Sequence, residues 1–201
     1  MTPKETGSKY DKIATWWQRQ HENSNYGISQ LNTALKFVSG GGSALDVGCG
    51  AGGRLINLLD TNGFSVTGID VSKEMVKLAK QTHIDHIFHH QDVCTFTPHN
   101  KYDFILAWDS IFHLPLSKQV DVLKTLCHAL NDDGVIAYTF GHGKGEHYDT
   151  WRDDTFYYSS IGIQNNLNTI MDLGLTPVHL DFDQYPQRHV FIVAKKNMGE
   201  N

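Results

Sequence analysis

The sequence predicts an α/β protein with a doubly wound, mostly parallel sheet of seven strands, an antiparallel terminal hairpin and an N-terminal helical arm. Two observations support this prediction. From residue 43 onward, short apolar runs alternate with segments of helical periodicity, which is typical of a parallel sheet covered on both faces. The last two apolar runs, 178–182 and 189–194, are joined by too few residues for a crossover helix, so they must be antiparallel.

The N-terminal arm, residues 1–40, is expected to contain two helices. Apolar and aromatic side chains recur every three to four residues over 10–38, and the stretch 25–27 interrupts the pattern. The triplet 40–42 consists of glycines and separates the arm from residues 41–201, which hold the sheet. Because glycine restricts the backbone least, we expect this triplet to act as a hinge for a lid.

The remaining elements follow from the same patterning. Expected strands lie at 44–47, 64–69, 84–89, 102–108 and 134–140. Expected helices follow residue 53 and occupy 72–82, 117–130 and 163–173. Ser72 and Ser117 are suitable helix N-caps, and Gly174 is a typical C-terminal stop.

Composition limits the function classes. A chain of 201 residues with 40% hydrophobic and 19% charged residues supports one structural domain with a sizeable core. The apolar runs are far shorter than the roughly 20 residues of a membrane helix, and the polar start resembles no signal peptide. A net charge of −5 disfavours a large nucleic-acid surface, and the 3 cysteines favour a reducing cytoplasm.

A glycine-rich loop, residues 46–53, joins the first strand to its helix. Glycines at this point let the backbone approach a ligand closely, and the helix N-terminus adds hydrogen-bond donors and positive potential. Gly48, Gly50 and Gly53 satisfy the dinucleotide fingerprint, whereas Gly48, Gly50 and Gly52 satisfy the G-x-G-x-G pattern of methyltransferases. The glycines alone do not distinguish a nicotinamide cofactor from S-adenosylmethionine.

Acidic residues at the strand ends discriminate between these cofactors. Asp46 lies two residues before the first glycine of the loop, where a pyrophosphate would face a carboxylate at close range. The ammonium and sulfonium of S-adenosylmethionine would be stabilised there instead. Asp70 ends the second strand and is placed to accept hydrogen bonds from ribose hydroxyls. Asp92 follows the third strand, where it could contact an adenine amino group.

With these motifs, the chain resembles the class I S-adenosylmethionine-dependent methyltransferases over about residues 43–195. The resemblance rests on Leu45-Asp46-Val47-Gly48-Cys49-Gly50-Ala51-Gly52, Gly68-Ile69-Asp70-Val71-Ser72, Gln91-Asp92-Val93, and Tyr102-Asp103 leading to Trp108-Asp109. It implies S-adenosyl-L-methionine as cofactor and residues 41–201 as the methyltransferase domain. The expected cofactor contacts in this region are Asp46, Gly48, Cys49, Gly50, Gly52, Asp70, Val71, Met75, Asp92, Val93, Trp108 and Asp109. Tyr10 of the helical arm is expected to reach the methionine carboxylate.

The methyl acceptor is expected to be a small molecule, because little of the chain lies outside the catalytic core. The stretch 108–115 departs from the Asn/Asp-Pro-Pro-Tyr motif used on DNA bases, so no DNA substrate is expected. Histidine suits proton removal at neutral pH, and we rank His113 first as general base, then His142 and His147. A protein or RNA acceptor, or a cofactor-binding module without transferase activity, remains the alternative.

Four further segments carry expectations. The insert around 154–159 could form part of the acceptor wall. The stretch 183–189 is interpreted as turn chemistry distant from the site. The histidines near Cys94 lack the ligand spacing of a zinc site, so no metal is expected. Finally, the glycines of 141–145 are expected to close over the site together with the arm.

Overall fold

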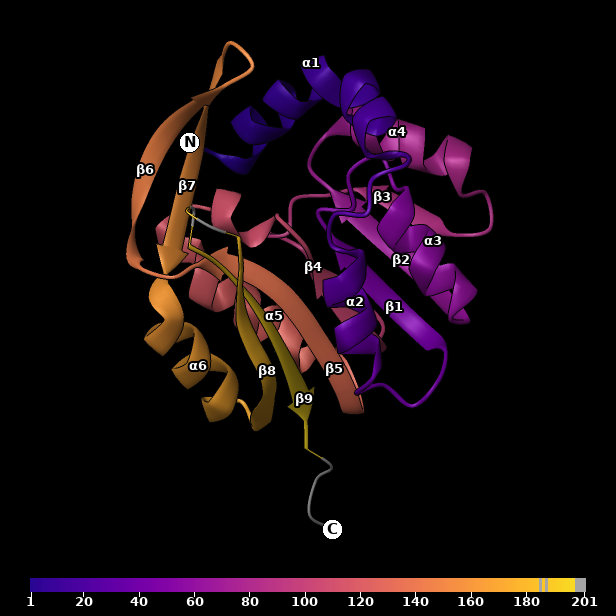
Figure 1. Ribbon diagram of the computed structural model, residues 1–201, viewed down its shortest axis with the longest axis vertical. Helices are drawn as coiled ribbons and strands as arrows, with labels where there is room; N and C mark the ends of the chain where they lie inside the picture. The colour runs from indigo at the N-terminus through magenta and orange to yellow at the C-terminus, as the bar shows by residue number, and fades with distance from the viewer. Residues whose placement is uncertain (185, 187, 198–201) are drawn as a thin grey trace.

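The computed structural model describes residues 1–184, 186 and 188–197. Figure 1 shows a twisted sheet with helices packed on both faces. The helices are α1 (Pro3–His21), α2 (Ile28–Leu35), α3 (Arg54–Thr61), α4 (Lys73–Thr82), α5 (Gln119–His128) and α6 (Gly162–Asp172). The strands of the main sheet are β1 (Gly42–Val47), β2 (Phe64–Asp70), β3 (Ile87–His90), β4 (Tyr102–Ala107), β5 (Leu130–Gly141), β8 (Leu175–Gln184) and β9 (His189–Lys196).

The main sheet has seven strands in the order β3-β2-β1-β4-β5-β9-β8. Strands β1 to β5 pair in parallel, whereas β9 is antiparallel to both β5 and β8. The predicted doubly wound, mostly parallel sheet with an antiparallel hairpin is therefore confirmed. The chain winds from β1 toward β3 in one direction and from β4 toward β5 in the other. This reversal opens a crevice at the carboxyl ends of β1 and β4.

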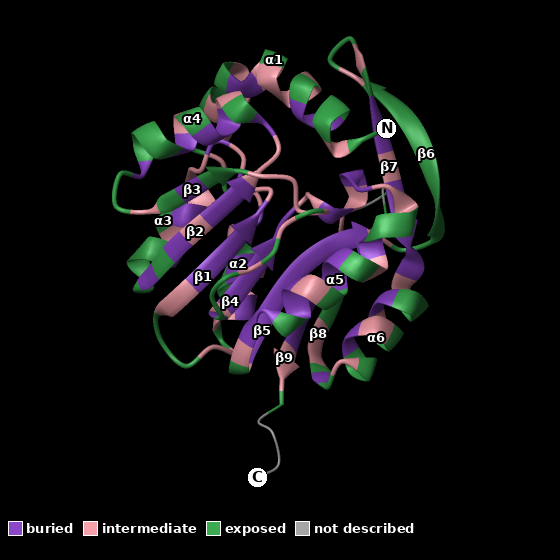
Figure 2. Ribbon diagram, turned by 180° about the vertical axis from the view of Figure 1, so that it is seen from behind, coloured by how far each residue is buried: buried purple, intermediate pink, exposed green. Residues whose placement is uncertain are grey.

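Two apolar layers hold the helices against the sheet because side chains alternate along each strand. Leu45 and Val47 belong to the layer that includes α5 and α6, and Ala44 belongs to the layer that includes α2 and α3. The central strands are buried along most of their length in Figure 2. Among the described helices, none combines the length and apolar character needed to cross a membrane.

Helix α1 is fixed to the rim of the sheet by its packing on α4. Oδ1 of Asp11 accepts hydrogen bonds from the Ser72 hydroxyl at 2.6 Å and from the Glu74 amide at 3.0 Å. Gly7 is buried, and a Cβ atom at this position would lie 2.4 Å from the carbonyl oxygen of Val71. The absence of a side chain at Gly7 therefore lets α1 approach the loop that follows β2.

The glycine triplet is more constrained than expected. A Cβ atom on Gly41 would lie 2.2 Å from the carbonyl oxygen of Gly63, and the Gly42 amide donates to that oxygen at 3.2 Å. Gly42 is also the first residue of β1. The prediction of a flexible hinge is therefore wrong for Gly41 and Gly42, which strand pairing and close packing fix in place.

A second sheet follows β5, in a segment for which the sequence predicts no regular structure. Strands β6 (Lys144–Trp151) and β7 (Asp154–Ile161) pair antiparallel. The two residues between them, Arg152 and Asp153, have φ values of 51° and 61°, as in a type I′ turn. This turn usually contains Asn-Gly or Asp-Gly, so the Arg-Asp pair in the sequence did not predict a hairpin. The expected glycine loop at 141–145 consists mainly of the end of β5 and the start of β6.

Other element boundaries differ by a few residues. The third strand begins at Ile87 instead of residue 84, because a turn occupies the preceding positions, with the His86 amide donating to the His83 carbonyl at 3.2 Å. The expected helix 117–130 is divided into a 3₁₀ turn, Leu116–Lys118, and α5. Residue 130 already belongs to β5, which pairs with β4 at this point.

Candidate functional site

A cavity of about 480 Å³ lies at the carboxyl ends of β1, β2 and β4. Helix α1 and the β6–β7 hairpin supply further wall residues, including Tyr10 and Trp151. All of the predicted cofactor contacts line this cavity, namely Tyr10, Asp46, Gly48, Cys49, Gly50, Gly52, Asp70, Val71, Met75, Asp92, Val93, Trp108 and Asp109. The fold thus gathers into one site residues that are spread over a hundred positions of the chain.

The glycine loop needs its glycines for backbone shape and for close packing. Gly48 has a φ of 76°, and a Cβ atom there would lie 2.4 Å from Cβ of Ser110. Gly52 has a φ of 75°, and a Cβ atom there would lie 2.6 Å from the His83 ring. Positive φ values disfavour residues with side chains. The loop therefore brings its backbone to the cavity wall, where Gly48, Gly50 and Gly52 border the open space.

Asp70 connects the glycine loop to the start of α4. Its Oδ2 accepts the Gly50 amide at 2.9 Å, and its Oδ1 accepts the Ser72 amide at 2.7 Å. These hydrogen bonds oppose the effect of burial, which raises the pKa of Asp70. Asp92 makes a similar local contact, because its Oδ1 accepts the Cys94 amide at 2.8 Å. Both carboxylates are therefore oriented by the backbone before any ligand binds.

Asp46 is the most strongly perturbed acid in the cavity. Burial is the largest cause and the neighbouring Asp70 carboxylate adds to it, while Arg54 opposes the shift, and together they raise the pKa of Asp46 to about 7. Asp46 accepts no hydrogen bond from the described residues. A cation placed beside this carboxylate would favour its ionised form. The site is thus electrostatically suited to a positively charged ligand.

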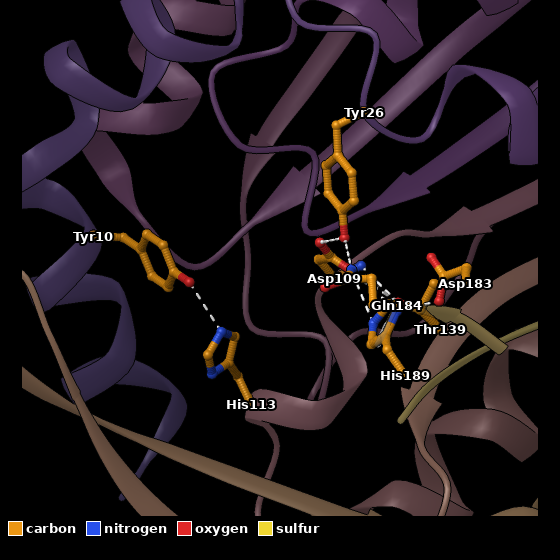
Figure 3. Close-up of polar contacts among 8 residues, drawn as sticks. All are labelled: Tyr10, Tyr26, Asp109, His113, Thr139, Asp183, Gln184 and His189. Atoms are coloured by element: carbon orange, nitrogen blue, oxygen red, sulfur yellow. Dashed lines mark hydrogen bonds and ion pairs between the residues drawn. The ribbon is translucent and has the colours of Figure 1, made fainter. Parts of the chain in front are cut away.

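The predicted base His113 is buried and held at both ring nitrogens. Nδ1 lies 3.0 Å from the carbonyl oxygen of Tyr157, which can only accept, so Nδ1 carries the proton. Burial lowers the pKa of His113, which is therefore neutral at pH 7. Nε2 is then an acceptor, and the Tyr10 hydroxyl donates a hydrogen bond to it at 2.9 Å (Figure 3). His113 presents an unprotonated nitrogen to the cavity, covered by a residue of α1.

His142 and His147, the second and third candidates for the base, lie outside the cavity lining. His142 is exposed after the end of β5, where its Nε2 lies 3.4 Å from Arg188. His147 is exposed on β6 and stacks on Tyr158, with ring centroids 5.3 Å apart. Among these three histidines only His113 therefore lines the cavity.

A second polar cluster lies across the cavity from Tyr10 and His113, as Figure 3 shows. The Asp109 carboxylate accepts hydrogen bonds from the Tyr26 hydroxyl at 2.7 Å and from the Thr139 hydroxyl at 3.2 Å. Nε2 of His189 lies 3.1 Å from Asp109 Oδ1, an ion pair that lacks hydrogen-bond alignment. Nδ1 of His189 contacts Asp183 Oδ1 at 2.6 Å. These two carboxylates raise the pKa of His189 to about 9, against the effect of burial.

The prediction that 183–189 lies far from the site is therefore wrong. Gln184 lines the cavity, and its side-chain amide donates to the Tyr26 hydroxyl. The cause is the position of β9, which pairs with β5 so that His189 lies opposite Gly141, at the end of β5. Sequence analysis missed His189 and Gln184 because they come from a hairpin whose place in the sheet no local pattern indicates. Tyr185 and Gln187, part of that predicted turn, lie outside the described residues.

Comparisons with known proteins agree with this geometry. Residues 44–134 match the family described as a methyltransferase domain. A ubiquinone biosynthesis O-methyltransferase from Haemophilus ducreyi is 29% identical over 64% of this chain and 60% of its own length. An uncharacterized methyltransferase from Staphylococcus carnosus is 25% identical over 86% of this chain and 88% of its own. Magnesium protoporphyrin IX methyltransferase from Synechocystis, solved with bound S-adenosylmethionine, has a TM-score of 0.71 at 16% identity, covering 98% of both chains.

The doubly wound sheet and the cavity at its strand ends define a Rossmann-like ligand-binding protein. The match of residues 44–134 to a methyltransferase domain, together with the methyltransferases among the relatives and the structural neighbours, supports a class I S-adenosylmethionine-dependent methyltransferase. The family predicted from the sequence is thereby confirmed. The chain spans about half the length of several curated relatives that it matches, from 37% to 60%.

Proposed function

We propose that the protein transfers a methyl group from S-adenosylmethionine to a small-molecule acceptor. The observation that carries this proposal is the presence of Asp46, Asp70 and Asp92 in one cavity with the glycine loop. Carboxylates stabilise a sulfonium and an ammonium but repel a pyrophosphate. The ubiquinone biosynthesis O-methyltransferase among the relatives supports a small-molecule acceptor.

The residues present fit this cofactor. Ser110 Oγ lines the cavity and has no hydrogen-bond partner among the described residues. Together with the unpaired Asp46 carboxylate, it is a polar group that a bound ligand would satisfy. We assign Asp46 and the glycine loop to the methionine moiety and Asp70 to the ribose hydroxyls. Asp92 would accept the adenine amino group, while Met75 and Val93 would lie against the adenine ring.

The bound cofactor would supply a methyl group on a positively charged sulfur, open to in-line displacement. The chain's own contribution is to align the acceptor and to exclude water from the transfer path. We assign His113 as the general base, because its Nε2 is unprotonated and faces the cavity. An acceptor hydroxyl or amine would replace the Tyr10 hydroxyl at Nε2 and deliver its proton there.

Calorimetric titration with S-adenosylhomocysteine tests the cofactor assignment. We expect binding by the unaltered protein, and we expect Asp70→Ala to weaken it by about 1.5–3 kcal/mol, the scale of hydrogen bonds to a charged group. Asp172→Ala is the matched control, since Asp172 is exposed on α6 and lines no part of the cavity. Binding of NAD in place of S-adenosylhomocysteine would reverse the assignment. Binding without methyl transfer to any phenol, amine, thiol or carboxylic acid would indicate a module without transferase activity.

A further inference from the structure

Asp109 is held in an unusual backbone conformation that directs its carboxylate to the cavity. Its φ is 50°, in the left-handed region that residues with side chains rarely adopt. The Asp109 amide donates to the Thr139 hydroxyl at 2.8 Å, and that hydroxyl donates back to the carboxylate. Strain of this kind is retained where the surroundings fix it, and it is concentrated at functional sites. The carboxylate is therefore positioned before any acceptor arrives.

Two carboxylates meet at one imidazolium in this cluster. Asp109 and Asp183 both contact His189, and the Arg54 guanidinium also attracts Asp109. The Asp183 side chain is 2% exposed and that of Asp109 is 24% exposed, so Asp109 is the carboxylate of this pair that a ligand in the cavity can reach. A carboxylate oxygen retains lone-pair positions beyond those that Tyr26, Thr139 and His189 use.

The rest of the cavity lining is also mainly acidic. Four aspartates line the cavity, and Arg54 is the only lysine or arginine among the described lining residues. Nε of Arg54 donates to the Tyr26 carbonyl, and the guanidinium lies 5.5 Å from the centre of the Tyr26 ring. An acceptor that carries a carboxylate or phosphate would therefore meet one cation against four carboxylates on this lining.

Aromatic rings surround the carboxylate. Tyr26, Trp108, Phe112 and Tyr158 all line the cavity. The Tyr26 and Trp108 ring centroids lie 5.4 Å apart, and those of Phe112 and Tyr158 lie 5.7 Å apart. The faces of aromatic rings attract cations.

We propose that the methyl acceptor is an amine, bound as its ammonium ion by the Asp109 carboxylate and the surrounding aromatic rings. This inference rests on the proposed function and names its substrate class. The ammonium gives one proton to Nε2 of His113, which Tyr10 vacates, and so gains a nitrogen lone pair. That lone pair attacks the methyl carbon. The C–N bond forms as the C–S bond breaks, the electron pair of the broken bond stays on sulfur, and the positive charge moves to nitrogen.

Three probes with one carbon skeleton test the proposal, namely phenethylamine, 2-phenylethanol and phenylacetate. Each is titrated into the full chain saturated with S-adenosylhomocysteine. We expect phenethylamine to bind at least about tenfold more tightly than the other two, in line with a hydrogen bond to a charged group. Asp109→Asn should remove this preference when the variant is titrated at a concentration of S-adenosylhomocysteine that saturates it. Asp172→Asn, on the exposed face of α6, should keep the preference.

The outcomes separate the two proposals. Equal or tighter binding of the alcohol or the acid by the unaltered protein overturns the amine assignment, whether or not Asp109→Asn folds. Methyl transfer to the alcohol but not to the amine overturns it as well, and leaves the proposed function intact. Failure of the unaltered protein to bind S-adenosylhomocysteine contradicts the proposed function itself.

Discussion

At the scale of single residues, hydrogen bonds determine the state in which His113 meets the cavity. The Tyr157 carbonyl fixes the proton on Nδ1, and burial keeps the ring neutral. Burial also raises the pKa of Tyr10, so its hydroxyl stays protonated and donates to Nε2. The proposed base thus has an unprotonated Nε2, and a residue of α1 covers this nitrogen.

Replacing His113 should separate turnover from cofactor binding. We expect His113→Gln to lower kcat by about 10²–10⁴-fold, the usual share of a general base, with the Kd for S-adenosylhomocysteine nearly unchanged. Because burial lowers the pKa of His113 below its ordinary 6.5, the kcat of the unaltered protein, measured at saturating S-adenosylmethionine, should fall only in more acidic solution. His113→Gln should lack this acidic decline. His142→Gln serves as the control, and an equal loss in that variant would contradict the assignment.

The raised pKa of Asp46 makes cofactor binding depend on pH. A cationic ligand favours the ionised carboxylate, whose pKa is about 7 in the free protein. S-adenosylmethionine should therefore bind more tightly as the pH rises from 6 to 8, by up to about tenfold, and should release a proton near pH 7. Calorimetry in two buffers with different ionisation enthalpies measures this proton. Asp46→Asn should abolish the pH dependence, and a pH dependence that persists in this variant would assign it to another group.

At the scale of elements, α1 and the tip of the β6–β7 hairpin meet over the cavity. Lys9 and Lys12 both form ion pairs with Asp154, the latter at 2.9 Å. Trp151 packs against Trp16 and Trp17, with ring centroids 5.6 and 5.9 Å apart. The Lys9 and Asp154 side chains are only 20% and 23% exposed, whereas Lys12 is 68% exposed, so the Lys9 pair and the aromatic contacts together hold the two elements in contact.

The close approach of α1 to the loop after β2 can be tested at Gly7. We expect Gly7→Ala to lower the free energy of unfolding by about 1–3 kcal/mol, as overpacking usually does, because the new Cβ atom would lie 2.4 Å from the Val71 carbonyl oxygen. It should also weaken S-adenosylhomocysteine binding, since Val71 lines the cavity. Urea unfolding and titration measure the two effects. Gly143→Ala, where no atom lies within 4 Å, should change neither.

At the scale of the whole molecule, the structure identifies α1 and the β6–β7 hairpin as the two elements that a lid would consist of. The sequence suggested two glycine hinges, whereas the structure has α1 docked on α4 and a regular hairpin, β6–β7, opposite it. Movement of these two elements away from each other would open the cavity, and their contact would exclude water.

Hydrogen exchange can detect this closure. Bound S-adenosylhomocysteine should slow amide exchange in residues 10–30 and 144–151, which supply Tyr10, Trp17, Tyr26 and Trp151 to the cavity lining. Helix α6 lines no part of the cavity and serves as the internal control. Protection of the same size in α6 would instead mean global stabilisation by mass action, and the lid would then be rejected.

The sequence alone predicted the side of the cavity that holds the glycine loop. Asp46, Asp70 and the glycine loop lie at the ends of consecutive parallel strands, so alternation and spacing were enough to place them together. On the opposite side the sequence indicated Asp109 and His113, whereas only the tertiary structure decided the positions of His189 and Gln184. His189 and Gln184 reach the site because β9 enters the sheet between β5 and β8, whereas His147 is exposed on β6. Strand order depends on contacts between segments far apart in the chain, and the periodicity within one segment does not predict those contacts.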